Sequence, residues 1–76
     1  NVEIVRMRAP ALAGSSLAEA DVRARTGVTI IAVERDGEVI TDLPPEFRIE
    51  SGDALIAAGT DEAVRDFANL AEDEGS

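Results

Sequence analysis

The sequence predicts an α+β domain with the element order β-α-β-β-β-α, in which a small, mainly antiparallel or mixed sheet packs against two helices. Three observations carry this prediction. A serine-capped apolar stripe over residues 16–26 predicts the first helix. A β-branched run that ends at Asp36-Gly37 predicts a hairpin, and Thr60 followed by two acidic residues predicts the start of the second helix.

An alternating apolar pattern predicts the first strand over residues 1–9. Val2 and Ile4 share one face of this strand, and Val5 and Met7 share the other. The proline that follows lacks an amide donor, so we expect the strand to end there.

The sequence Ser16-Leu17-Ala18-Glu19 has the form of a capping box, which predicts that the first helix begins at this point. Gly27 suits the left-handed position that closes a helix, so we expect the helix to end near Thr26. Its buried stripe is narrow and consists of Leu17, Ala20, Val22 and Ala24.

Residues 28–34 predict a strand that is apolar on both faces, which belongs at the centre of a sheet or at an interface. The two faces are formed by Val28, Ile30 and Ala32 and by Ile31 and Val33. Asp36-Gly37 supplies the two positive φ angles of a type I′ turn, after which Val39-Ile40 returns as a short antiparallel strand.

The sequence Leu43-Pro44-Pro45 predicts a loop, and residues 47–49 predict a brief extended piece. A turn at Gly52-Asp53 leads into a strand over 54–58. The second helix begins after the Thr60 cap, and its buried stripe consists of Val64, Phe67, Ala68 and Ala71.

The 76 residues support one core, which we expect to span residues 1–71, with an acidic flexible tail over 72–76. Because the chain begins with Asn1 and not with Met, we expect it to be a piece of a longer polypeptide. No apolar run approaches the roughly 20 residues that span a bilayer, so we expect no direct membrane insertion.

The chain carries 16 acidic residues against 7 arginines and no lysine, which gives a formal net charge of -9. Nucleic acid is not an expected partner, because phosphate backbones are bound through clustered Lys and Arg. An acid-rich, lysine-free composition is typical of halophilic proteins, since concentrated salt screens the self-repulsion.

We expect no enzyme activity, because a chain without His, Cys, Tyr or Lys lacks the usual nucleophiles and proton carriers. Gly14-Ser15-Ser16 ahead of a helix could hold a phosphate, but no lysine follows as in a P-loop, so a serine cap is the favoured interpretation. The Ser15 hydroxyl remains a candidate ligand contact. We expect no metal site, although three acidic residues cluster loosely around the hairpin: Asp36, Glu38 and Asp42.

Four segments together resemble the C-terminal subdomain of RCK regulatory proteins, also called the TrkA C-terminal domain. They are Leu12–Glu19, Gly27–Gly37, Gly52–Leu55 and Gly59-Thr60 ahead of a helix with Phe67. The resemblance implies a cytoplasmic homodimer that regulates a potassium channel, transporter or antiporter. It also implies an upstream Rossmann-type RCK half or a transporter to which the domain is attached.

The resemblance further implies that two copies enclose a small-ligand site, which in some bacterial members takes the cyclic dinucleotide c-di-AMP, and that the domain has no cofactor of its own. Carried onto this chain, the implied site consists of Ile4, Val5, Ala11, Leu12, Ser15, Ile31 and Val33. The net charge disfavours a dianionic ligand, for which the nearby cations are Arg6, Arg8 and Arg35.

The function expected from these observations is a regulatory, ligand-sensing and dimerisation domain of a cation transport system, with potassium as the expected ion. The alternative is a purely structural dimerisation module of a transporter that binds no ligand.

Overall fold

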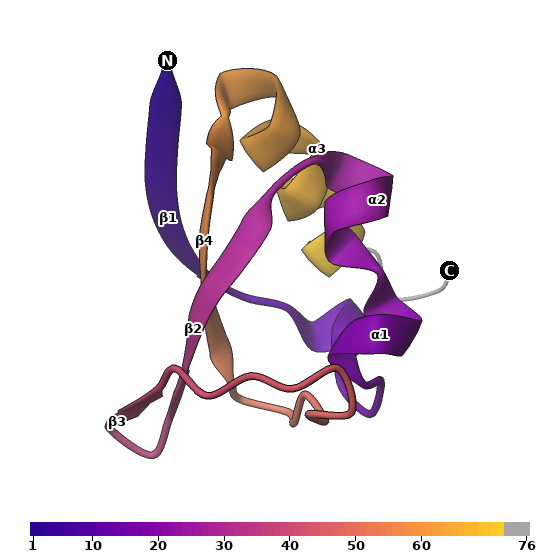
Figure 1. Ribbon diagram of the computed structural model, residues 1–76, viewed down its shortest axis with the longest axis vertical. Coiled ribbons are helices and arrows are strands. Elements are labelled where there is room, and N and C mark those ends of the chain that lie inside the picture. Colours follow the sequence, from indigo (N-terminus) through magenta and orange to yellow (C-terminus); the bar gives the residue numbers. More distant parts are fainter. Residues whose placement is uncertain (73–76) are drawn as a thin grey trace.

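The computed structural model describes residues 1–72, in which a four-stranded antiparallel sheet carries every helix on one of its faces (Figure 1). The strands are β1 (Val2–Arg8), β2 (Thr29–Arg35), β3 (Glu38–Ile40) and β4 (Ala54–Thr60), in the spatial order β1-β4-β2-β3. The helices are the short 3-10 turn η1 (Pro10–Leu12), α1 (Leu17–Ala20), α2 (Val22–Thr26) and α3 (Asp61–Glu72). The predicted α+β class and its antiparallel sheet are confirmed.

The register of the sheet separates a core face, which the helices cover, from an uncovered face, here called the outer face. On the core face, Leu55 of β4 lies between Met7 and Val33. The two faces of β1 are as predicted, because Val5 and Met7 pack against the core while Val2 and Ile4 are 73% and 69% exposed. One face of the first strand is therefore packed against the core, and its other face is exposed.

The predicted faces of β2 are wrong, because the strand contains a β-bulge between Ile30 and Ala32. A bulge adds one residue to the alternation and shifts every later side chain to the opposite face. Ile30 pairs with Ala57 and Val33 pairs with Leu55, so both lie on the core face. Ala32 lies on the outer face instead, and Ile31 at the bulge is 42% exposed.

The single helix predicted over 16–26 is two short helices, α1 and α2, separated by Asp21. This residue has left-handed angles of φ 48° and ψ 45°, which Asp tolerates better than most residues. Residues two apart point in nearly opposite directions on a continuous helix. The break re-aims the chain so that Ala20 and Val22 are both buried, whereas Ala24, predicted in the buried stripe, is exposed.

The capping box at Ser16 is confirmed, because its hydroxyl accepts from the Glu19 amide at 3.1 Å and its own amide donates to the Glu19 carboxylate at 2.8 Å. That second hydrogen bond, followed by the charge of Arg48, lowers the pKa of the Glu19 carboxyl. The next amides of the first turn donate to the carbonyls of Phe47 and Pro45. The start of α1 therefore has no free amide for a phosphate, and the serine-cap interpretation holds.

The Asp36-Gly37 turn is confirmed, since both residues have the positive φ that a type I′ turn needs, 54° and 81°. Residues 47–49 are extended as predicted, with a single bridge from Arg48 to Ser16. Thr60 caps α3 through its hydroxyl, which accepts from the Ala63 amide at 3.2 Å. The predicted tail begins inside this helix at Glu72, and its other residues lie outside the described residues.

An ion-pair cluster, here called the Arg35 clamp, joins the end of β2 to the segment that leads into β4. Arg35 donates to both carboxylate oxygens of Asp53, at 2.9 and 2.7 Å, and to the Arg48 carbonyl at 3.0 Å. Its guanidinium also lies 5.0 Å from the centre of the Phe47 ring. Asp53 is buried and also accepts from the Glu50 amide at 2.8 Å, within the predicted turn at Gly52-Asp53.

The core lies between the sheet and the helices, and its largest fully buried side chains are Phe67, Ile49, Leu55, Val28 and Val33. Helix α3 supplies Phe67 and Ala71 to this core as predicted, together with Ala63, which the sequence pattern did not single out. Among residues 1–72, no helix has both the length and the apolar character needed to cross a membrane.

Gly59 in β4 lies where no side chain fits. A Cβ atom at this position would lie 2.9 Å from Cγ1 of Val28 and 3.2 Å from Cβ of Ala63. Because overpacking a tight core is costly, we expect Gly59→Ala to lower the free energy of unfolding by about 1–3 kcal/mol in urea denaturation. In a Val28→Ala background, which removes the nearest methyl group, the same substitution should cost less. Equal costs in both backgrounds would contradict this close approach.

Candidate functional site

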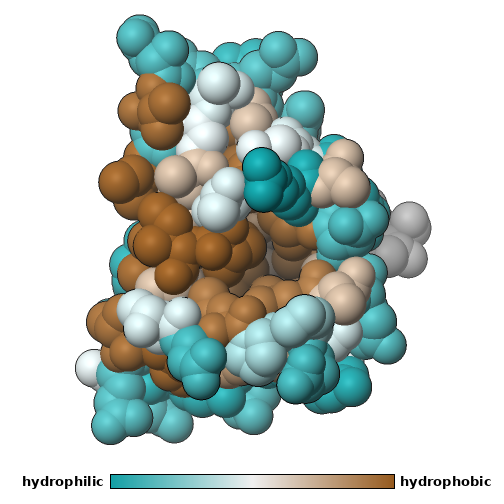
Figure 2. Space-filling model, viewed as in Figure 1, coloured by the Kyte–Doolittle hydropathy of each residue, from teal (hydrophilic) through white to brown (hydrophobic). Residues whose placement is uncertain are grey.

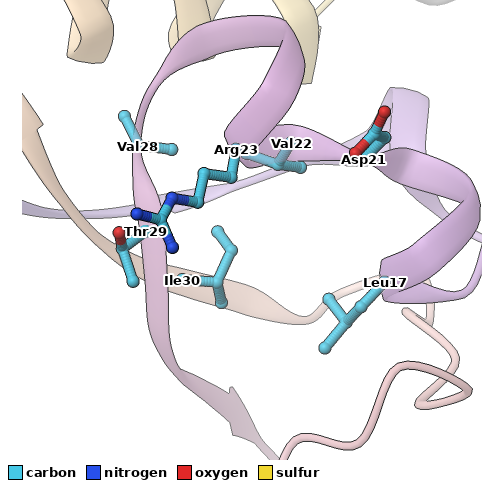
Figure 3. A pocket seen from close by; sticks show the side chains of 7 residues that line it. All are labelled: Leu17, Asp21, Val22, Arg23, Val28, Thr29 and Ile30. Carbon is cyan, nitrogen blue, oxygen red and sulfur yellow. The ribbon is translucent and has the colours of Figure 1, made fainter.

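The candidate site is an apolar hollow of about 200 Å³ between the helices α1 and α2 and the start of β2. Figure 2 shows hydrophobic surface gathered around this hollow, on the side of the molecule where β2 lies in front of the sheet. Its lining consists of Leu17, Asp21, Val22, Arg23, Val28, Thr29 and Ile30. The side chains of Leu17 and Ile30 face one another across it (Figure 3).

The reversal of the chain at Gly27 builds this hollow. Gly27 takes φ 93° at the end of α2, so the chain turns directly from the helix into β2. Thr26 fixes the turn, because its hydroxyl donates to the Val22 carbonyl at 2.8 Å and accepts from the Val28 amide at 3.2 Å. The break at Asp21 then sets α1 at a different angle from α2, which opens the space between them and the strand.

Arg23 is the positively charged residue in the lining of the hollow. Within residues 1–72 it makes no ion pair and no side-chain hydrogen bond, in contrast to Arg35 in its clamp. Its guanidinium extends toward Thr29, at the far end of the hollow from the Asp21 carboxylate (Figure 3). The arrangement combines apolar walls with one positive group at the mouth, which suits a ligand with a flat apolar part and an anionic part.

The seven site residues implied by the family resemblance do not line this hollow. Two of them, Leu12 and Val33, are buried in the core, and Val5 packs against it. Ile4 and Ile31 are exposed, and Ile4 points to the face opposite that of Val5. Ala11 and Ser15 are half-buried in and after η1. A role in ligand binding stays a prediction for these residues.

The three cations expected near a ligand also lie elsewhere. Arg6 pairs with Glu34 across β4 on the outer face, and Arg35 is held in its clamp by Asp53. Arg8 lines a second, polar depression of about 410 Å³ on that face, together with Arg6, Glu34, Asp36, Gly37, Gly52 and Ala54. The cation at the apolar hollow is Arg23, which was not among the cations expected near a ligand.

Sequence reasoning missed the hollow because it depends on the break at Asp21. One signal was present in the pattern, namely that Ala20 and Val22 are both apolar although a straight helix can bury only one of the two. The turn at Gly27 was predicted, but nothing in the sequence revealed that Leu17 and Ile30 would face each other across an open space.

The acidic side chains outside the hollow bear on the expectations about catalysis and metal binding. The hydrogen bond and the charge of Asp61 raise the pKa of the Glu3 carboxyl, but both residues are exposed and line neither depression. Among residues 1–72, no three acidic side chains are grouped closely enough to hold a metal ion, and this includes Asp36, Glu38 and Asp42.

Comparison with known proteins links this fold to potassium transport. The family model of the TrkA-C domain matches residues 2–72. The chain is 39% identical over 59 residues to the "Probable potassium channel protein 2" of Methanocaldococcus jannaschii. The match covers 78% of this chain but only 17% of the channel protein, so the chain corresponds to a small part of its relative.

Two solved relatives contain a cyclic dinucleotide. The RCK C domain of the potassium transport protein KtrA, in complex with cyclic diadenosine monophosphate, is 37% identical with a TM-score of 0.81, over 88% of this chain and 80% of that one. The RCK_C domain dimer of S. agalactiae BusR, in complex with c-di-AMP, is 26% identical with a TM-score of 0.80, over 88% and 92% of the two chains.

BusR is also known in complex with its busAB-promotor DNA. The BusR chain of that complex is 27% identical to this chain with a TM-score of 0.72, and the match covers 91% of this chain and 36% of the BusR chain. Because this relative shares the fold of the chain and is found with DNA, the expectation that nucleic acid is not a partner is not confirmed.

Proposed function

Since this chain belongs to the TrkA-C domain family, we propose that it is a non-catalytic regulatory domain of a potassium channel or transporter system, which dimerises and responds to a small ligand. It would act on the cytoplasmic side of the membrane, next to its transport partner and joined to an upstream RCK half or to the transporter itself. The observation that carries the ligand-sensing part is the apolar hollow with Arg23 at its mouth, an arginine that forms no ion pair within residues 1–72.

A cyclic dinucleotide is the first ligand to test. The KtrA and BusR relatives each contain one, and its two bases and two phosphates match what two copies of the hollow offer. A two-fold dimer presents each feature twice, so each copy would receive one base between Leu17 and Ile30 and one phosphate at Arg23.

The net charge of -9 on each copy opposes a dianion, as the sequence indicated. Arg23 supplies a local positive charge, and at 1 M salt the Debye length is only about 3 Å, so the acidic surface beyond the hollow is screened. Binding of the ligand would regulate by favouring one arrangement of the dimer, since an effector shifts an equilibrium only through its differential affinity.

Calorimetric titration of the domain with c-di-AMP at low and at high KCl tests this proposal. We expect binding by the wild type and a loss of affinity of about 10-fold to 100-fold in Arg23→Gln, which removes a charge-assisted contact worth about 1.5–3 kcal/mol. The matched control is Arg65→Gln, an exposed arginine on α3 that does not line the hollow. Equal affinities of the two variants would contradict a role for the hollow.

The second candidate function is a structural dimerisation module without a ligand. It is favoured by the outer face, where the four exposed large apolar side chains of the described residues lie: Val2, Ile4, Ile31 and Val39. A panel of nucleotides and cyclic dinucleotides separates the two functions, because silence across the whole panel would leave the structural role alone. We propose no nucleic-acid contact for this domain, since its seven arginines are dispersed and three of them are held in ion pairs, namely Arg6, Arg35 and Arg48.

A further inference from the structure

The polar depression of about 410 Å³ on the outer face, here called the Arg8 depression, lies on the side of the sheet opposite the apolar hollow. Its floor is Ala54 of β4, which pairs with Arg8 on one side and with Glu34 on the other. Ala54 is small and buried, whereas the side chains beside it are long, so the floor lies below its walls. A Cβ atom added at Gly37 or Gly52 would meet no heavy atom outside the adjacent residues within 4 Å, so the rim is open at both turns.

The Arg35 clamp fixes the shape of this depression. Arg35 lies between two of the lining residues, at positions 34 and 36, and Asp53 lies between two others, at positions 52 and 54. The hydrogen bonds of 2.9 and 2.7 Å that join Arg35 to Asp53 therefore hold two parts of the lining together. A site whose walls are already in place loses less conformational entropy when a ligand binds.

Two opposite charges in the lining are available to a ligand. Arg6 and Glu34 form an ion pair with each other. Arg8 and Asp36 form no ion pair within residues 1–72, and both are exposed. Arg35, the residue before Asp36, is held in its clamp. The depression therefore offers one guanidinium and one carboxylate that do not satisfy each other.

The charges in and around the depression select the class of ligand. An anion would be attracted by Arg8, but two carboxylates of the lining and the net charge of -9 would repel it. A cation would meet two guanidinium groups in the lining. A zwitterion carries no net charge, so the field of the whole domain does not oppose it, and each of its ends can meet a group of opposite sign.

The cationic end of such a ligand should be a primary ammonium. A quaternary ammonium has no N–H group, and proteins recognise it with cages of aromatic rings. Of the described residues that line the depression, none is aromatic. A carboxylate such as that of Asp36 instead accepts hydrogen bonds from N–H donors. Pockets for small molecules measure about 300–1,000 Å³, so the volume suits a ligand at the small end of that range.

We propose that the Arg8 depression binds a small amino acid in its zwitterionic form, with the carboxylate of the ligand at Arg8 and its ammonium at Asp36. The domain then has a second ligand site, on the face of the sheet that the helices leave uncovered. This site shares no lining residue with the apolar hollow, so the proposal does not rest on the proposed function.

NMR titration of the domain with free glycine and with β-alanine tests the proposal, because these probes differ only in the separation of their two charges. We expect at least one of them to shift the amide signals of Gly37 and Gly52 in a saturable manner. Acetate and methylamine each lack one charge, and glycine betaine lacks the N–H donors. At the same KCl concentration, all three should bind more weakly by about 10-fold or more.

Two conservative variants locate the site. Arg8→Gln and Asp36→Asn each remove one charge, and Asn tolerates the left-handed φ of 54° at position 36 as Asp does. Each variant should lower the affinity for the bound probe by about 10-fold to 100-fold. Arg65→Gln and Asp66→Asn, which remove exposed charges of α3 outside the depression, are the matched controls and should leave that affinity unchanged. Circular dichroism confirms that all four variants fold.

The proposal is overturned if neither amino acid produces a saturable shift, if acetate binds as tightly as the amino acids, or if Arg8→Gln binds like the wild type. The c-di-AMP titration decides the proposed function separately. Arg23→Gln should leave the affinity for the amino acid unchanged, and Arg8→Gln should leave the affinity for c-di-AMP unchanged. A loss of amino acid binding in Arg23→Gln would contradict the assignment of the ligand to the Arg8 depression.

Discussion

Replacing Arg35 with methionine should lower the free energy of unfolding by about 3–5 kcal/mol, because it leaves the buried carboxylate of Asp53 without its charged partner. The variant also loses the hydrogen bond to the Arg48 carbonyl and the contact with the Phe47 ring. A 76-residue domain has a total stability of about 4–11 kcal/mol, so this one change removes much of it. Urea denaturation followed by circular dichroism measures the loss.

Two variants show whether the clamp is responsible. Glu50→Gln removes an exposed carboxylate that lies 3.5 Å from Arg35 and should cost less than about 1 kcal/mol. In Arg35→Met combined with Asp53→Leu, the unpaired charge is gone, so the double variant should be more stable than Arg35→Met alone. Wild-type stability in Arg35→Met would contradict the argument.

The same clamp predicts acid sensitivity with a definite sign. The guanidinium of Arg35 lowers the pKa of the Asp53 carboxyl, and the Glu50 amide acts in the same direction while burial opposes both. A carboxyl whose pKa is lower in the folded state contributes stability above its unfolded pKa of about 3.9 and loses it as the pH falls toward the folded value. As the pH falls from roughly 5 to roughly 2, the free energy of unfolding should decrease less in the double variant than in the wild type.

Replacing Phe67 with alanine should cost about 3–5 kcal/mol, because this ring is fully buried between α3 and the sheet and its removal leaves a cavity. Phe67 is the largest fully buried side chain of the described residues, and the chain has only one other aromatic residue. Thermal and urea unfolding should both detect the loss of stability. Among the described residues, the core contains no second fully buried aromatic side chain that could move into the cavity.

Leu70→Ala is the matched control for this prediction, since Leu70 belongs to the same helix but is only half-buried. It should cost about 1 kcal/mol, well below the value for a fully buried leucine. Similar losses in the two variants would contradict the argument that the complete burial of Phe67 sets its contribution.

Features that depend on neighbouring residues were predictable from the sequence, and features that depend on distant pairing were not. The type I′ turn needs only Asp36 and Gly37, and the capping box needs only Ser16 and Glu19. The bulge at Ile31 depends instead on how β2 aligns with β4, and it reversed the predicted faces of the later residues. The resemblance to the TrkA C-terminal domain rested on the order of several segments and is confirmed by the family match.

The candidate site shows the same division. Gly27 was predicted to close a helix and does so, and this turn forms one end of the hollow. Asp21 has left-handed backbone angles, which separate α1 from α2 and allow both Ala20 and Val22 to be buried. The burial of these two side chains stabilises the break only when the helices pack against the sheet. For that reason, the position of Arg23 at an open apolar surface could not be foreseen from periodicity.

The hydrogen bonds at the start of α1 have a consequence for how this wall of the hollow is maintained. Its first amides are bound by the carbonyls of Pro45 and Phe47, residues that lie far along the chain and are anchored by the Arg35 clamp. A helix of four residues has no autonomous stability in water. A peptide that contains the capping box alone would be unstructured. Proteolytic cleavage of the segment after β3 would unfold α1, although the cleaved bond lies outside that helix.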